Sequence, residues 1–202
     1  ASETHNKKNV NRTVDETMAD NAVMAERIRA EGLTCAAVIA TAFGCPYEGR
    51  IEQSRVLDLA ERFAEAGATE IGFGDTTGMC NPAYAGDFFT AALERLPGVE
   101  VTAHFHNTRG QGLANAYAAL QAGCTSFESS FGELGGCPVP KGSTGNIATE
   151  DLVSMFHEMD VQTGVDLPAV IEAARAAQTV LGRALTSHSL IAGPIDWHLQ
   201  NV

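Results

Sequence analysis

The stretch VEVTAHFHNTRGQG, residues 99–112, places two histidines at the polar end of a short apolar run. Side chains alternate across a β-strand with a period of two, so His104 and His106 are predicted to point to the same side, and Phe105 to the other. Two imidazoles on one side of a strand end can occupy adjacent positions around one metal ion. The simpler alternative is a pair of hydrogen-bonded polar residues. The spacing favours metal binding.

The rest of the chain repeats one pattern, in which a short apolar run is followed by a polar loop and an amphipathic helix. A capping box, TVDE at 13–16, opens the first predicted helix, and Asn81 with Pro82 opens another. Regular alternation of strands and helices indicates an α/β fold with parallel strands. The predicted strands are 33–43, 99–106 and 124–131, and the segment 68–78 is predicted to be a strand with the loop that follows it. The predicted helices cover 13–28, 53–66, 82–96, the segment from about 113 to 120, the segment that Thr149 opens, and 167–182.

Two architectures fit this alternation, an open doubly wound sheet and a (β/α)8 TIM barrel. The glycines of GFGDTTG, residues 72–78, do not have the spacing of a dinucleotide-binding loop. Polar residues gather at the carboxyl ends of the predicted strands, where barrel enzymes build their sites, which favours the barrel. Only four complete strands are predicted, and ASETHN at 1–6 resembles the tail of a fifth. We therefore expect a single domain, 1–202, that is the C-terminal portion of a barrel, about strands 5–8 with the end of strand 4.

Composition excludes several classes of function. The 202 residues have a formal net charge of −12, which argues against nucleic-acid binding. No apolar run approaches the ~18 residues of a membrane span, and the first residues lack the apolar stretch of a signal peptide. Five cysteines without a C-x-x-C pair indicate free thiols in a reducing compartment. We expect a protein of the bacterial cytoplasm or the mitochondrial matrix that is not secreted and not bound to a membrane.

The loop GELGGCPVPKGSTGN, residues 132–146, is the expected source of a third metal ligand. Its last residue, Asn146, offers an amide oxygen that suits a hard divalent cation, although it could instead cap the next helix. Imidazole and oxygen ligands without thiolate favour Mg²⁺ or Mn²⁺ over structural Zn²⁺. Cys137 lies among glycines in this loop and is predicted to be accessible, so its thiol is a candidate acid or base.

Three segments resemble the 3-hydroxy-3-methylglutaryl-CoA lyase family of metal-dependent TIM-barrel lyases and synthases: FGCPYEG at 43–49, HFHNTRGQGLANAYAALQAG at 104–123 and GELGGCPVPKGSTGNIATEDLV at 132–153. Related synthases and aldolases are similar in the H-x-H and the final Gly-Asn, but not in the cysteine loop. The resemblance implies retro-Claisen cleavage of an acyl-CoA thioester, 3-hydroxy-3-methylglutaryl-CoA, to acetyl-CoA and acetoacetate.

The resemblance also implies roles for particular residues. His104, His106 and Asn146 would hold Mg²⁺ or Mn²⁺ together with an aspartate near the family's first strand. Cys137 would transfer the proton to the acetyl-CoA enolate, with His104 beside it. Asp75, together with Thr76, would contact substrate; the alternative for Asp75 is a turn residue ahead of the next helix.

The chain departs from the family pattern near the H-x-H at Asn107 and Arg109, and in the cysteine loop at Glu133 and in the run PVPK at 138–141. The family's Arg-Asp motif has no counterpart in this sequence. Three explanations stay open: the chain is a piece of a longer protein, a partner supplies the motif, or the chain is inactive. Two further functions stay open, a Claisen-type synthase or related aldolase and a non-catalytic half-barrel with exposed strand edges. We expect a homo-oligomer.

Overall fold

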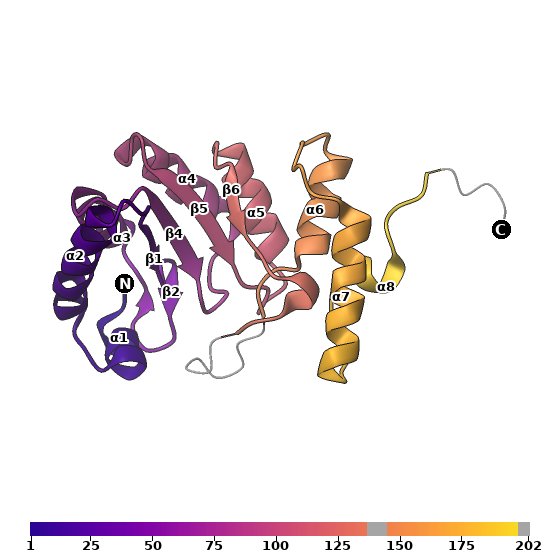
Figure 1. The fold of residues 1–202 in the computed structure, drawn as a ribbon, viewed down its shortest axis with the longest axis horizontal. Helices are drawn as coiled ribbons and strands as arrows, with labels where there is room; N and C mark the ends of the chain where they lie inside the picture. The colour runs from indigo at the N-terminus through magenta and orange to yellow at the C-terminus, as the bar shows by residue number, and fades with distance from the viewer. Residues whose placement is uncertain (137–144, 198–202) are drawn as a thin grey trace.

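The computed structural model describes residues 1–136 and 145–197, in which helices and strands alternate along most of the chain (Figure 1). The elements in chain order are α1 (Glu3–Val10), α2 (Val14–Ala30), β1 (Ala36–Ile39), β2 (Gly44–Cys45), β3 (Gly49–Arg50), α3 (Gln53–Glu65), β4 (Glu70–Asp75), α4 (Pro82–Arg95), β5 (Glu100–Phe105), α5 (Gly112–Gln121), β6 (Ser126–Glu128), the short 3-10 helix η1 (Phe131–Glu133), α6 (Thr149–Glu158), α7 (Leu167–Leu181) and α8 (His188–Ala192).

Four parallel strands form the main sheet in the order β1-β4-β5-β6. Each strand pairs with the next one along the chain within this sheet, and helices α3, α4 and α5 connect β1 through β6. Consecutive parallel strands joined by helices are the repeating unit of a (β/α)8 barrel. The predicted α/β class with parallel strands is confirmed; β2 and β3 form a separate antiparallel pair in the β1–α3 connection.

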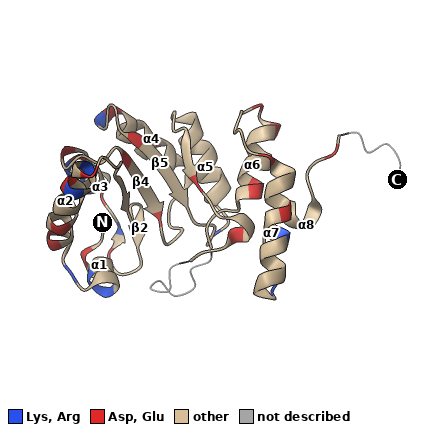
Figure 2. Ribbon diagram, viewed as in Figure 1, with Lys and Arg blue, Asp and Glu red and all other residues tan. Residues whose placement is uncertain are grey.

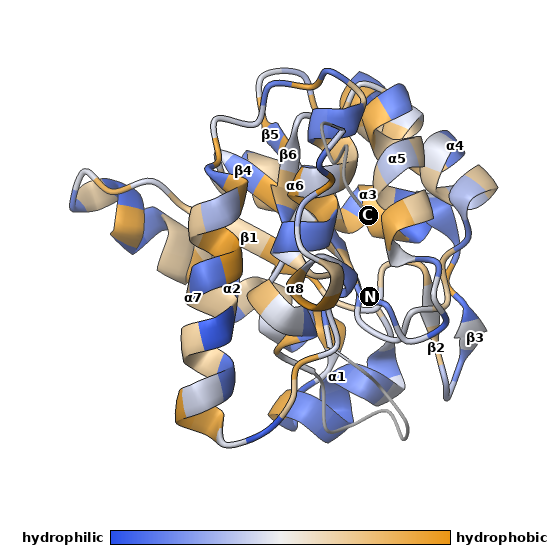
Figure 3. Cartoon of the chain, turned by 90° about the vertical axis from the view of Figure 1, so that its right-hand side faces the viewer, coloured by the Kyte–Doolittle hydropathy of each residue, from blue (hydrophilic) through white to orange (hydrophobic). Residues whose placement is uncertain are grey.

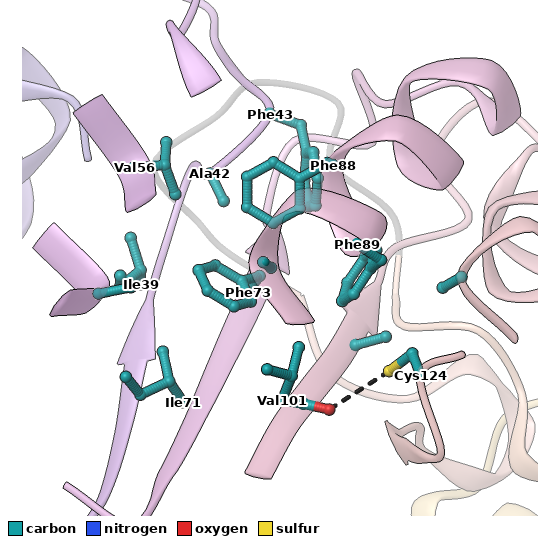
Figure 4. Close-up of a cluster of buried hydrophobic side chains, with 14 of the residues drawn as sticks. Ile39, Ala42, Phe43, Val56, Ile71, Phe73, Phe88, Phe89, Val101 and Cys124 are labelled. Atoms are coloured by element: carbon teal, nitrogen blue, oxygen red, sulfur yellow. Dashed lines mark hydrogen bonds between the residues drawn. The ribbon is translucent and has the colours of Figure 1, made fainter. Parts of the chain in front are cut away.

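The face of the sheet toward α4 is apolar. Phe73 from β4 and Phe105 from β5 are fully buried, and both pack against Phe89 of α4. Figure 4 shows Phe43, Phe88 and Phe89 gathered around Phe73, in a cluster of edge-to-face and tilted rings. Aromatic burial of this kind contributes much of a core's stability. This aromatic layer holds β4 and β5 against α4 and so positions the carboxyl ends of the two strands.

The opposite face of the sheet is polar. Thr102 lies in the centre of β5 and is hydrogen-bonded to Glu70 of β4 and Ser126 of β6, at 2.9 Å each. Side-chain alternation places His104 on this same face. Gly74 pairs with His104 in the β4–β5 register, so β4 presents no side chain beside that imidazole. The polar face therefore leads directly to the H-x-H at the carboxyl end of β5.

Residues 3–10 correct the expectation of a strand tail at the start of the sequence, because they form helix α1. Ser2 caps this helix, its side chain accepting a hydrogen bond from the backbone N–H of His5 at 3.1 Å. Glu3 lies in the first turn, where a negative charge is favourable. The cap at Ser2 thus favours a helix, and this short polar run lacks the alternation of apolar and polar residues that identifies a strand.

The strands are shorter than predicted. The segment predicted to be a strand over 33–43 is extended only over Ala36–Ile39, because Thr41 takes a left-handed conformation with φ 54°. The predicted helix boundaries agree more closely: Thr13 forms the expected capping box with Glu16, and Asn81 caps α4 through the backbone N–H of Tyr84. On α5 the large side chain of Tyr117 is exposed, and the small residues Ala116 and Ala119 are buried.

Helices α6, α7 and α8 form a second apolar cluster beyond the sheet, around Ile171 and Leu190. Figure 3 views the molecule from this end and shows apolar residues on the outside of α7 and α8, where Val180 and Ile191 are exposed. Lys and Arg residues lie at separated places on α1, α2, α3, α4 and α7, interspersed with acidic residues (Figure 2). No helix within residues 1–136 and 145–197 is long and apolar enough to cross a membrane.

Candidate metal centre

The two histidines converge at the carboxyl end of β5. Their Nε2 atoms lie 3.3 Å apart, and the ring centroids are 5.2 Å apart. His106 is buried and His104 is half-buried. Two nitrogen ligands at about 2.1 Å from a cation in adjacent octahedral positions are separated by about 3.0 Å. The imidazoles therefore face the same side, as the alternation predicts, at a separation that suits one coordination sphere.

Glu128 orients the first of these imidazoles. It pairs with His104 in the β5–β6 register, and its Oε2 lies 2.9 Å from His104 Nδ1. A carboxylate at Nδ1 favours the tautomer with its proton on that nitrogen, in which the lone pair of Nε2 is directed toward His106. Sequence reasoning missed Glu128. Its alternation with Ser126 on the fourth strand was visible, but the register that brings it opposite His104 is set only when the sheet forms.

Asn146 joins the histidines through the backbone. It forms an isolated antiparallel bridge with His106, with hydrogen bonds from Asn107 N to Gly145 O at 3.1 Å and from Ile147 N to Phe105 O at 3.0 Å. Its side-chain Nδ2 donates to Leu134 O at 3.2 Å. Its Oδ1 is buried and accepts no hydrogen bond within the described part of the chain. A buried acceptor without a donor is costly, and a cation would satisfy it.

These atoms together fit a hard divalent cation. They are two imidazole nitrogens and one unsatisfied amide oxygen, a set that suits Mg²⁺ or Mn²⁺. Among residues 1–136 and 145–197, no group of three or more His, Cys, Asp and Glu side chains is arranged to hold a metal. His104, His106 and Asn146 are thus candidate ligands that would form part of a coordination sphere, and water, substrate or further protein oxygens would complete it.

Cys137 lies outside the described residues, so its predicted role stays a prediction. The two limbs of this loop, around Leu134 and around Asn146, lie side by side. The backbone carbonyl of Leu134, on the outgoing limb, accepts from both the N–H and the side chain of Asn146, on the returning limb. Gly145 packs so tightly here that a Cβ would lie 1.5 Å from Glu133 O.

Asp75 is on the other side of the sheet from the histidines. In the register it pairs with Phe105, whose side chain is in the apolar core. Its carboxylate is 1% exposed and accepts hydrogen bonds from the backbone N–H groups of Met79 and Cys80, at 2.9 and 3.2 Å. Burial raises the pKa of Asp75 to about 7, although these N–H groups and Arg109 act to lower it. This geometry favours the turn role that was the alternative for Asp75.

The other expected substrate contact, Thr76, follows directly on Asp75. Its Oγ1 accepts a hydrogen bond from the backbone N–H of Thr41 at 3.0 Å, which ties the end of β4 to the end of β1. The same loop is held by Arg109, whose guanidinium donates to the carbonyls of Thr77 and Gly78 at 2.8 and 3.1 Å. Substrate contact by Asp75 or Thr76 stays a prediction, and the structure shows both residues in the β4–α4 turn.

A cavity of about 460 Å³ opens beside Asn107 and the two limbs of the cysteine loop. Its lining residues are Asn107, Glu133, Gly135, Gly136, Gly145, Arg183 and Thr186. Glu133 bridges this cavity's walls: its carboxylate accepts hydrogen bonds from Asn107 Nδ2 and from Thr186 Oγ1. The sequence showed Glu133 as a departure from the family pattern but gave no sign of these partners, because Thr186 lies 53 residues further along the chain.

Comparison with known proteins gives close relatives. The chain is 42% identical over 190 residues to hydroxymethylglutaryl-CoA lyase YngG of Bacillus subtilis, a match that covers 94% of this chain and 64% of the relative. It is 43% identical over 195 residues to the (R)-citramalyl-CoA lyase of Chloroflexus aurantiacus, covering 96% of this chain and 62% of the relative. The chain therefore spans somewhat less than two thirds of either relative. These shares of length do not bear out the expectation that it is the C-terminal portion.

Solved structures agree in fold. An HMG-CoA lyase from Acinetobacter baumannii, in complex with coenzyme A and 3-methylmalate, superposes with a TM-score of 0.93 at 37% identity, covering 100% of this chain and 65% of that one. The fold is that of the TIM-barrel lyases, as the position of the polar residues at strand ends predicts. The sequence profile described as HMGL-like matches residues 1–177. The chain therefore belongs to the HMGL-like family.

Proposed function

We propose that the protein containing this chain is a divalent-metal-dependent lyase that cleaves 3-hydroxy-3-methylglutaryl-CoA to acetyl-CoA and acetoacetate. The observation that carries the proposal is the pair of Nε2 atoms 3.3 Å apart, together with the unsatisfied Oδ1 of Asn146, a residue that forms a backbone bridge with His106. The 42% identical relative of that activity supports the substrate class. An acyl-CoA thioester also agrees with the coenzyme A bound in the Acinetobacter baumannii structure.

In this proposal His104, His106 and Asn146 hold Mg²⁺ or Mn²⁺. The cation, when bound, acts as a Lewis acid that stabilises negative charge on the substrate oxygen from which the hydroxyl proton is lost. Glu128 holds the proton of His104 on Nδ1, so that Nε2 stays available as a ligand. Leu134 O holds the Asn146 amide by its Nδ2 group, so that Oδ1 stays directed away from that contact.

The protein's own groups move the protons. Cleavage of the carbon–carbon bond next to the alkoxide releases acetoacetate and leaves an acetyl-CoA enolate, which needs one proton at carbon. We assign this proton to the thiol of Cys137, nine residues before Asn146 in the sequence, and propose that His104 assists the transfer. Asp75 and Thr76 remain candidate substrate contacts, through the β4–α4 turn that they hold in place.

A second substrate has a specific observation in its favour. The (R)-citramalyl-CoA lyase relative is 43% identical to this chain, level with the hydroxymethylglutaryl-CoA lyase. Asn107 and Glu133, two of the departures from the lyase pattern, line the cavity next to Asn146. Residues that line this cavity could select a different acyl group without any change in the metal ligands.

The test uses the full-length protein with both thioesters. We expect Mg²⁺- or Mn²⁺-dependent cleavage of 3-hydroxy-3-methylglutaryl-CoA, measured as acetoacetate formed, with kcat/KM at least about tenfold above that for (R)-citramalyl-CoA. Chelation of the metal should abolish this cleavage, and His106→Ala should strongly reduce it. Glu172→Ala, a substitution at an exposed position on α7, should leave the cleavage unchanged. The reverse preference would establish the second substrate. Failure of a folded, metal-loaded protein to cleave either thioester would overturn the proposal.

A further inference from the structure

Glu133 adopts an unusual backbone conformation directly beside the candidate site. Its φ is 58°, in the left-handed region that favours glycine, and it follows Gly132 at φ 64°. A non-glycine residue persists in this region only where its surroundings compensate for the unfavourable conformation. The contacts of the Glu133 side chain are therefore the place to look for that compensation.

The Glu133 carboxylate joins three segments that are distant in sequence. One oxygen accepts from Asn107 Nδ2, on the loop after β5, and the other accepts from Thr186 Oγ1, between α7 and α8. Glu133 itself lies at the end of η1, after β6. Charge-assisted hydrogen bonds to both oxygens of a half-buried carboxylate hold these segments more firmly than neutral pairs would.

Two routes lead from Glu133 to Asn146. Along the backbone, the next residue is Leu134, whose carbonyl accepts from Asn146 N at 3.4 Å and from Asn146 Nδ2 at 3.2 Å. Through its side chain, Glu133 holds Asn107, whose own backbone N–H donates to Gly145 O at 3.1 Å. The residue before Asn146 and the amide group of Asn146 itself are thus both positioned by groups that Glu133 fixes.

We propose that Glu133 is a positioning residue. Its carboxylate holds Asn107 and Thr186 by hydrogen bonds, and these contacts keep the Asn146 Oδ1 in place to bind the divalent cation. This inference rests on the proposed metal site. It also links the segment between α7 and α8 to that site, because Thr186 is one of the two groups clamped. Partners of this kind set the geometry of a metal ligand without touching the metal.

The test is the Mn²⁺ affinity of the full-length protein, measured by calorimetry or by the EPR signal of free Mn²⁺. Glu133→Ala removes both hydrogen bonds, and Glu133→Gly removes them while also relieving the left-handed conformation, so a folding defect is not expected for it. Both should bind Mn²⁺ about 10- to 100-fold more weakly than the wild type. Glu133→Gln keeps both contacts, since its Oε1 can accept from Asn107 and its Nε2 can donate to Thr186, and should stay within about threefold.

Glu172→Ala, which removes an exposed carboxylate on α7, is the matched control and should bind as the wild type does. A purely structural role would lower the melting temperature of Glu133→Ala and leave its Mn²⁺ affinity unchanged. Wild-type affinity in both Glu133→Ala and Glu133→Gly would therefore overturn this inference and leave the metal site standing. A wild-type protein that binds no Mn²⁺ would overturn the metal site and this inference together.

Discussion

His104 and Glu128 stand opposite each other on neighbouring parallel strands, and the imidazole Nδ1 lies 2.9 Å from the carboxylate Oε2. The contact uses the ring nitrogen that faces away from His106, whose Nε2 lies 3.3 Å from the other nitrogen of His104. One side of the ring is thus held by the sheet, and the other is directed at the candidate metal position. A carboxylate behind a ligating imidazole fixes its tautomer and raises its basicity.

The first prediction concerns this carboxylate. Glu128→Ala should weaken Mn²⁺ binding by about 10- to 100-fold, because His104 loses the partner that keeps its proton on Nδ1. Glu128→Gln should fall between Glu128→Ala and the wild type, since an amide oxygen can still accept from Nδ1 but has no charge. Calorimetric titration of the three proteins checks this order. Equal affinity in all three would show that Glu128 does not orient the ligand.

The second prediction separates proton transfer from metal binding. Cys137→Ser should keep the Mn²⁺ affinity of the wild type while turnover falls by roughly 10²- to 10⁴-fold, the usual contribution of a positioned acid or base. His106→Ala should weaken metal binding itself. Turnover and affinity measured on both variants distinguish the roles. Unchanged turnover in Cys137→Ser would refute its catalytic role, and loss of the metal would make the thiol a ligand.

The third prediction concerns the close packing of the loop limbs. A Cβ on Gly145 would lie 1.5 Å from Glu133 O, so Gly145→Ala must separate the two limbs and displace Asn146. We expect at least about a tenfold loss of Mn²⁺ affinity, the scale of a misplaced ligand. Gly86→Ala on α4 is a control for the loss of a glycine, because φ there is not left-handed and a Cβ would make only an ordinary contact, 3.9 Å from Ala118 O. Tight Mn²⁺ binding by Gly145→Ala would show that Asn146 does not contribute to the site.

The fourth prediction concerns the pH dependence of stability. Burial raises the pKa of Asp75 to about 7, whereas the unfolded chain loses this proton near pH 4. Between these values the folded state binds the extra proton, so the free energy of unfolding falls as the pH rises toward 7. The contribution is about 4 kcal/mol at most, from 1.36 kcal/mol for each pKa unit.

Asp75→Asn has no proton to lose at this position. The wild type should therefore lose stability relative to Asp75→Asn between pH 5 and pH 8, and the difference should level off above pH 8. Urea denaturation of both proteins across this range measures it. A difference in unfolding free energy that does not change with pH would mean that the turn N–H groups of Met79 and Cys80 hold Asp75 ionised throughout.

Local patterns predicted most of the elements. The capping box at Thr13 and the Asn81–Pro82 start of α4 depend only on neighbouring residues, and both form as expected. The prediction of a strand tail at residues 1–6 was wrong. There too the neighbouring residues determine the element, because the side-chain cap at Ser2 favours helix α1. The strands were predicted too long, because a left-handed backbone conformation such as that of Thr41 ends a strand without any change in the hydrophobic pattern.

The sequence by itself determined the alternation of strands and helices and the common direction of His104 and His106, because both follow from periods of two and 3.6 residues. It also marked Asn146 as the candidate third ligand. Only the tertiary structure decided that Glu128 supports His104, that Asp75 lies on the opposite side of the sheet, and that Glu133 joins Asn107 to Thr186. These relations depend on the register of parallel strands and on contacts between distant segments. Such contacts are fixed by packing of the whole chain, and no local pattern encodes them.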